Sequence, residues 1–208
     1  TKYLEEKMEE RGVKASMALG GIPAAIVEMH EKGLVRTVAC SQSFDAVAAK
    51  AIVDYPGIIE IDNSLYANPA RKGCMLNRET FGILAALEVD IDFNVNILTG
   101  SNGEMMGGLG GGPDVAAGAQ ISIVVLPIVR GRIPSVVKKV FTCCTPGDTV
   151  AVVITEAGIA LNPNHKNYQE LKEDLEKTSL KLVTIEELRQ TAEGMTGPPK
   201  PIECTDKI

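Results

Sequence analysis

Short apolar runs alternate with amphipathic stretches through the first third of the chain. The apolar runs predict strands at residues 13–19, 34–40 and 58–61, and the amphipathic stretches predict helices at 2–11, 23–32 and 46–54. Gly12 and Gly33 lie where two of these helices should end, and Pro23 stands at the start of one. The order strand, helix, strand, helix, strand predicts a parallel sheet with right-handed crossovers.

The remaining two thirds of the chain contain shorter apolar pieces. Strands are predicted at 121–127, 136–142, 150–155, 158–161 and 180–183, with an antiparallel meander over 145–161. Helices are predicted at 168–177 and from Thr184, where Glu187 completes a capping box. Residues 81–89 fit either a helix or a strand, while 63–77 and 194–208 predict irregular segments. The predicted fold class is therefore α/β, a mixed and largely parallel sheet flanked by helices, in a single domain spanning 1–208.

Residues 103–119 (GEMMGGLGGGPDVAAGA) contain a dense run of glycine. Its members are Gly107, Gly108, Gly110, Gly111 and Gly112. Glycine allows a ligand to approach the backbone, and successive N–H groups can form a concave anion-binding nest. Pro113 and Asp114 then suit the first turn of a helix. We interpret the run as a ligand-binding loop, with a mobile surface loop as the alternative. Its spacing matches neither a P-loop nor the dinucleotide fingerprint.

Two further candidates lie at the ends of the first two predicted strands. Gly20 and Gly21 precede a predicted helix, so they form either a smaller anion site or a plain turn. Ser41 and Gln42 follow the second strand, at the edge where open α/β sheets bind ligands. Asp45 is expected to cap the next helix.

Polar side chains also mark two later segments. Asn94 and Asn96 share one face of a predicted strand at 93–98, where they are either exposed or directed at a ligand. Arg130 and Arg132 flank Gly131 after a buried strand. Their guanidinium groups match carboxylate and phosphate geometry, although two arginines in an exposed turn would give the same pattern.

Composition narrows the function classes. The 208 residues carry a formal net charge of −6, which argues against nucleic acid as the partner. No apolar run approaches the length of a membrane span, and no signal peptide is evident, so a cytoplasmic location without membrane contact is expected. The five cysteines lack metal-ligand spacing, so we expect reduced thiols and no metal, with Cys143 and Cys144 as small core residues.

Several segments together resemble one family. They are FNVNILTGSNGEMMGGLGGGPDVAAGA, ISIVVLPIVRGRIPSVV, TPGDTVAVVITEAGIALNP, SQSFD, SLYANPARKG, LVTIEEL and GPPKPIECTDKI. From about Gly20 onward the chain resembles the alpha subunits of citrate lyase, which are citrate CoA-transferases. Those subunits are about twice as long, and the resemblance is to their C-terminal half. It implies a domain of the NagB/RpiA/CoA-transferase type.

The resemblance also implies a reaction. An acetyl thioester on a CoA-like prosthetic group of the acyl-carrier (gamma) subunit exchanges its acetyl group for citrate, which gives citryl thioester and acetate. The beta subunit then cleaves the citryl thioester. A lyase complex with these subunits, and a homo-oligomer, are the implied partners.

Comparison with the wider CoA-transferase superfamily assigns roles to the candidates. Gln42 stands where common members carry a catalytic glutamate, and glutamine is no carboxylate nucleophile, so direct transfer in a ternary complex is implied. Gly110 and Gly111 would supply N–H groups to the reacting carbonyl. The remaining candidates would bind substrate or cofactor: Gly20, Gly21, Ser41, Asn94, Asn96, Gly107, Gly108, Gly112, Asp114, Arg130 and Arg132. The alternatives are a CoA-transferase or acyl-CoA hydrolase for another acid, and a non-catalytic nucleotide-binding or assembly domain.

Overall fold

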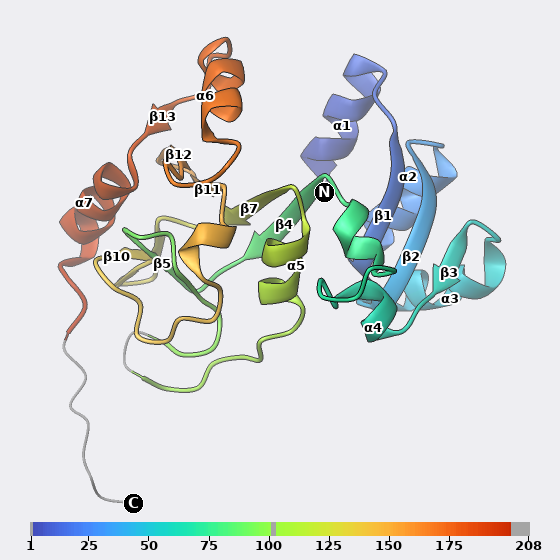
Figure 1. Cartoon of the computed structure of the whole chain (residues 1–208), viewed down its shortest axis with the longest axis horizontal. Coiled ribbons are helices and arrows are strands. Elements are labelled where there is room, and N and C mark those ends of the chain that lie inside the picture. The colour runs from blue at the N-terminus through green and yellow to red at the C-terminus, as the bar shows by residue number, and fades with distance from the viewer. Residues whose placement is uncertain (1, 101–102, 201–208) are drawn as a thin grey trace, which may run out of the picture. The chain divides into compact units, whose positions relative to one another are not determined.

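A computed structural model describes residues 2–100 and 103–200 of the chain (Figure 1). The chain divides into two compact units, residues 1–77 and 78–208. Each has its own sheet and its own buried cluster. The single domain over 1–208 stays a prediction.

The first unit is a parallel βαβαβ arrangement. Its elements are α1 (Lys2–Arg11), β1 (Ala15–Ile22), α2 (Ala24–Glu31), β2 (Val35–Ser43), α3 (Ala46–Asp54), β3 (Ile58–Glu60) and α4 (Asn63–Tyr66). The strands pair in the order β1-β2-β3, all parallel, and α2 and α3 pack on them (Figure 1). This confirms the predicted alternation. The short α4 and a 3-10 turn at Met75–Arg78 correct the expectation that 63–77 is irregular throughout.

The core of this unit is aliphatic. Val27 and Met29 of α2 pack with Val38 of β2 and Ile58 of β3, all nearly inaccessible to solvent. Gly12 and Gly33 end α1 and the turn after α2 with positive φ, as predicted.

The second unit is built around a mixed five-stranded sheet. Its elements are β4 (Phe81–Ala85), β5 (Glu88–Asp90), β6 (Val95–Asn96), α5 (Gly112–Gly118), β7 (Ile121–Val125), β8 (Val129–Arg130), β9 (Ile133–Pro134), β10 (Val136–Val137), β11 (Val152–Thr155), β12 (Gly158–Leu161), α6 (Tyr168–Glu176), β13 (Leu182–Val183) and α7 (Ile185–Thr196). The five strands lie in the order β13-β12-β11-β7-β4, and only β11 and β12 are antiparallel. The mixed, largely parallel sheet is thus confirmed.

Several predicted boundaries in the second unit change. The strand predicted at 136–142 is reduced to β10. The strand predicted at 93–98 is reduced to β6, and Phe93, with φ 64°, interrupts the extended backbone just before it. The ambiguous 81–89 stretch forms two strands, β4 and β5. Helix α7 continues to Thr196 with the predicted Thr184–Glu187 capping box, so the irregular tail starts later than expected. The predicted turn at 101–102, Cys204 and the last eight residues lie outside the described residues.

Candidate functional site

The two glycines of the first unit are covered by the chain itself. They lie within β1, at a bulge between Gly20 and Gly21, so the predicted turn into the helix begins later, at Pro23. A Cβ added to Gly21 would lie 2.2 Å from the Phe44 ring, and one added to Gly20 would lie 2.8 Å from the Tyr66 hydroxyl. Aromatic rings therefore occupy the space that an anion would need.

Asp45 fills the predicted anion position at the start of α2. Its carboxylate accepts hydrogen bonds from the backbone N–H of Ala24 at 2.7 Å and of Ala48 at 2.8 Å. One side chain thus caps α2 and α3 together, which confirms the predicted capping role. Because these N–H groups stabilise the charged form, the pKa of Asp45 is lowered.

Ser41 and Gln42 lie at the carboxyl end of β2, as predicted. Gln42 is exposed and stands opposite Gly21 in the parallel ladder, whereas Ser41 is half-buried. Gln42 is therefore accessible to a ligand at this sheet edge, and its role stays a prediction.

In the second unit, Asn96 belongs to a buried polar network. Its side chain has no solvent exposure, and its Nδ2 donates to Glu88 Oε2 at 3.1 Å and to the Thr99 carbonyl at 2.6 Å. Its Oδ1 accepts from the N–H groups of Leu98 and Thr99, both at 3.0 Å. The expectation that Asn96 is exposed or directed at a ligand is wrong, since its amide fixes the backbone turn that follows it.

Asn94 makes a parallel set of contacts. Its Nδ2 donates to Asp90 Oδ2 at 3.2 Å, and its Oδ1 accepts from the N–H of Gly147 at 2.9 Å. Asp90 is 1 % exposed and also accepts from the N–H groups of Asp92 and Asn94. Asn94 therefore ties the 145–150 turn to the β5–β6 segment. It is half-buried, so its role toward a ligand stays a prediction.

The sequence reading missed Glu88 and Asp90. Both are buried carboxylates that alternate with Val89 on β5. Acidic residues inside an apolar strand are rarely buried without polar partners, so their place between Leu87 and Ile91 was an available signal.

The Gly-rich loop begins on the segment that Asn96 holds. The Leu98 carbonyl accepts from the N–H groups of Met106 at 2.8 Å and Gly107 at 3.3 Å. Because Asn96 fixes the backbone of Leu98, the buried network positions the first residues of the loop.

Beyond that anchor the loop is open. Gly107, Gly108 and Gly110 are exposed, and a Cβ on Gly108 or Gly110 would meet nothing within 4 Å. Within the described part of the chain, the backbone N–H groups of Gly108, Leu109 and Gly110 donate no backbone hydrogen bond. Gly110 has φ +53°, a conformation that favours glycine. The loop thus presents free donors, as an anion-binding nest requires.

Helix α5 follows the loop as predicted. Gly111 is its N-cap, Pro113 lies in its first turn, and Asp114 places a carboxylate there. Gly112 packs against Ile97, 3.4 Å from a Cβ built on it. These contacts fix the end of the loop on the same segment that fixes its start.

The arginine pair lies on a separate hairpin. Arg130 ends β8 and Arg132 lies in the β8–β9 turn, with Gly131 between them at φ +61°. Arg132 is exposed, while the Nε atom of Arg130 is buried without a hydrogen-bond partner. The hairpin packs against α7.

The adjacent cysteines are not core residues. Cys143 is exposed and Cys144 is half-buried, which corrects the prediction, and both are free thiols, as are Cys40 and Cys74. Partial desolvation and the Asp90 carboxylate raise the pKa of the Cys143 thiol.

Known proteins resemble this chain along its whole length. The chain matches the family of citrate lyase alpha subunits (CitF) over residues 1–208. The citrate lyase alpha chains of Klebsiella pneumoniae and Escherichia coli (strain K12) are 49 % and 47 % identical over 208 residues. The chain belongs to the citrate lyase alpha-subunit family. It spans 40 % of the length of these relatives.

Solved structures agree with this membership. The putative alpha subunit of citrate lyase from Streptococcus mutans, solved in complex with citrate, superimposes with a TM-score of 0.94 at 44 % identity, covering 100 % of this chain and 40 % of that one. A 4-hydroxybutyrate CoA-transferase from Porphyromonas gingivalis gives a TM-score of 0.53 at 19 % identity, covering 84 % of this chain and 48 % of that one. The second likeness confirms the CoA-transferase-like fold.

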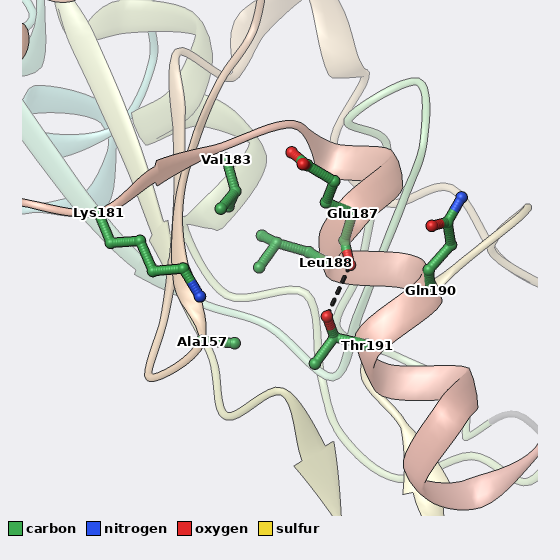
Figure 2. A pocket seen from close by; sticks show the side chains of 7 residues that line it. All are labelled: Ala157, Lys181, Val183, Glu187, Leu188, Gln190 and Thr191. Carbon is green, nitrogen blue, oxygen red and sulfur yellow. Dashed lines mark hydrogen bonds between the residues drawn. The ribbon is translucent and has the colours of Figure 1, made fainter.

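In this citrate lyase alpha-family chain, one cavity is lined by none of the candidate site residues predicted from the sequence (Figure 2). It measures about 410 Å³ and is lined by Ala157, Lys181, Val183, Glu187, Leu188, Gln190 and Thr191. Glu187 is engaged in the α7 capping box, and the Thr191 hydroxyl donates to the Glu187 carbonyl at 2.8 Å. Glu187 and Thr191 at this cavity thus form hydrogen bonds at the start of and within α7.

No helix within residues 2–100 and 103–200 is long and apolar enough to cross a membrane. No three His, Cys, Asp or Glu side chains gather there as metal ligands would.

Proposed function

We propose that this chain forms the part of a citrate CoA-transferase that carries a thioester-binding loop. The observation that supports this most directly is the open Gly-rich loop, with unengaged N–H donors, in a chain that matches the citrate lyase alpha family throughout. In the proposed reaction, an acetyl thioester of an acyl carrier exchanges its acetyl group for citrate. The products are citryl thioester and acetate.

The loop would act on the charge that develops during this exchange. A citrate carboxylate attacks the acetyl thioester carbonyl and displaces the carrier thiolate, which gives a citryl–acetyl anhydride. The thiolate then attacks the citryl carbonyl of this anhydride and releases acetate. Negative charge develops on the attacked carbonyl oxygen in each step. N–H groups of Gly108, Leu109 and Gly110 are suited to stabilise that oxygen, or to hold the attacking carboxylate. Such preorganised donors contribute roughly 10²-fold or more to a rate.

The groups near Gln42 support transfer without a covalent enzyme intermediate. Gln42 carries an amide rather than a carboxylate, and the Asp45 carboxylate is occupied by two helix starts. Neither side chain is poised to attack a thioester. Positioning of two bound reactants would then supply most of the rate. In this proposal Arg130 and Arg132 bind citrate carboxylates or the cofactor's phosphates. Gln42 is a separate candidate, for orienting the acyl group.

The fold changes the proposed role of the asparagines. Asn94 and Asn96 are engaged within the protein, so we assign them to holding the loop and its neighbouring turn. Gly20 and Gly21 are covered by aromatic rings and carry no role in this proposal.

The proposal extends to the place of the chain in a longer subunit, its location, its partner subunits and its thiol substrate. The chain would correspond to the C-terminal half of its longer relatives, and act in the cytoplasm with a beta subunit and an acyl-carrier subunit. Its thiol substrate would be CoA or a CoA-like prosthetic group.

Transfer activity of the full-length subunit tests the proposal. Acetyl-CoA serves as donor and citrate as acceptor, and mass spectrometry detects citryl-CoA. We expect citryl-CoA without an enzyme adduct that hydroxylamine or borohydride traps. A trapped adduct would contradict the ternary complex. Turnover of another acid in place of citrate would indicate a different CoA-transferase, and hydrolysis without transfer would indicate an acyl-CoA hydrolase.

A further inference from the structure

The sheet of the second unit has an apolar face that the described residues of that unit leave exposed. Phe81 and Ile83 of β4 are 58 % and 63 % exposed, and Val125 of β7 is 43 % exposed. Paired residues extend the face across the two strands, since Phe81 stands beside Ile121 and Ile83 beside Ile123. The face is therefore a continuous two-strand surface, which we call the β4–β7 face.

The opposite side of the same strands is covered. Helix α5 packs on β4 and β7 (Figure 1). Gly82 lies on the face opposite to Phe81 and Ile83, and its lack of a side chain allows α5 to approach closely. A Cβ on Gly82 would lie 2.6 Å from Val115 of α5 and 3.2 Å from Ala119, which caps the end of that helix. Parallel sheets are normally covered on both faces, so the β4–β7 face lacks a layer.

The composition of the face indicates a permanent interface. Its side chains are Phe81, Ile83, Ala85, Ile121, Ile123 and Val125, with no charged or polar member. Apolar surfaces without charge are typical of obligate contacts, whereas transient partners meet surfaces that are more polar. A face of this kind left in water would also favour aggregation.

The length of the relatives supports one occupant for the β4–β7 face. The chain spans 40 % of the citrate lyase alpha chains that it matches, so most of such a subunit lies outside these residues. We propose that the β4–β7 face is the docking surface for that remaining part of its own subunit, through an apolar segment that supplies the missing layer. The proposal rests on family membership and on the exposed face, not on the transfer reaction.

Photocrosslinking in the full-length subunit tests this assignment. Phe81 is replaced by p-benzoylphenylalanine, which keeps an aromatic ring at the same exposed place, and the crosslinked peptides are identified by mass spectrometry. We expect peptides from outside residues 1–208 within one polypeptide. Val53 on α3, which is 86 % exposed, receives the same group as a control and should give little or no such product.

Each other outcome overturns the proposal. A crosslink to residues 1–77 would mean that the chain covers its own face. A crosslinked band of twice the subunit mass, with peptides from residues 78–208, would indicate a second copy. A yield no higher than at position 53 would show that the face is bare.

A charge placed on the face provides a second measurement. Ile83→Lys should lower the Tm of the full-length subunit by several degrees or leave it insoluble, because the lysine would be buried at the contact. Val53→Lys should leave the Tm unchanged. Equal Tm values for the two variants would overturn the proposal, whatever the transfer activity of either one.

Discussion

The two glycine-rich segments of this molecule look alike in sequence but differ in what surrounds them. At Gly20 and Gly21 the rings of Tyr66 and Phe44 fill the space beside the backbone. At Gly108 and Gly110 the backbone faces open space. Glycine permits close approach in both places, yet in the first the approaching group is part of the same chain.

The nearby helix starts show the same difference. Asp45 supplies an internal carboxylate to the N-terminus of α2, so that positive end is already neutralised. The N–H groups just before α5 have no such internal partner among the described residues. A glycine-rich turn therefore indicates a ligand site only where no side chain of the protein completes it.

The largest effect is expected at the open loop. Gly110→Val should lower transfer by the full-length subunit about 100-fold or more, because valine disfavours the positive φ and the loop donors would move. Citryl-CoA formation measures the loss, and circular dichroism monitors the fold. Gly12→Val is the matched control, with φ +62° and open space at the end of α1. Equal activity of the two variants would refute the loop assignment.

The buried network under the loop should matter mainly for stability. Asn96→Ala removes a hydrogen bond from the Glu88 carboxylate and the amide that fixes the 97–99 turn. We expect the free energy of unfolding to fall by about 2–4 kcal/mol, as measured by urea denaturation. Asn77→Ala removes an exposed amide and should cost less than about 1 kcal/mol. Similar losses for both would mean that the network does not hold the loop.

Asp45 should affect stability in a pH-dependent way. Its lowered pKa means that its stabilising contribution is complete above the ordinary carboxyl value and is lost as the pH falls through the lowered pKa. Asp45→Asn should therefore lower the Tm by a few degrees at neutral pH, and this difference should shrink in acid. Asp62→Asn, which removes a cap from the short α4 alone, should have a smaller effect.

The same Asp45→Asn variant distinguishes a cap from a nucleophile. Transfer by the full-length subunit should persist at more than about a tenth of the original rate, since a cap contributes only to stability. Complete loss of transfer in a folded protein would indicate instead that Asp45 acts as the nucleophile.

The smallest effect is expected at the closed glycine pair. Gly21→Ala displaces the Phe44 ring, which is 61 % exposed and free to rotate outward. We expect a change of less than about threefold in transfer, since this position makes no ligand contact in our proposal. A loss as large as that of Gly110→Val would mean that the two segments act alike.

Local sequence patterns were sufficient for the regular elements. Helix α3 and strand β12 form where the periodicity placed them, and the capping box at Thr184 and the Pro113 start of α5 are local features that neighbouring residues decide. The order of apolar runs also predicted the parallel β1-β2-β3 sheet, because chain direction and crossover length limit how such runs can pair.

The hydrogen-bond partners of the candidate side chains come from residues that are distant in sequence. The alternation along 93–98 predicted accessible side chains at Asn94 and Asn96. In the structure Asn94 donates to Asp90 and Asn96 donates to Glu88, both on β5. The N–H of Gly147, far along the chain, donates to Asn94. Sequence spacing does not show which polar groups meet, since that depends on the packing of strands remote in sequence.

The sequence by itself determined the α/β class, the family and the presence of a glycine-rich loop, because these follow from local periodicity and from residues read in order. Only the tertiary structure decided that one glycine segment is closed and the other open. It also decided that Asn96 holds the segment where the loop begins, that Asn94 holds the 145–150 turn, and that the described residues of the second unit leave the β4–β7 face exposed. The physical reason is that exposure and hydrogen-bond partners depend on what other parts of the chain bring to each residue.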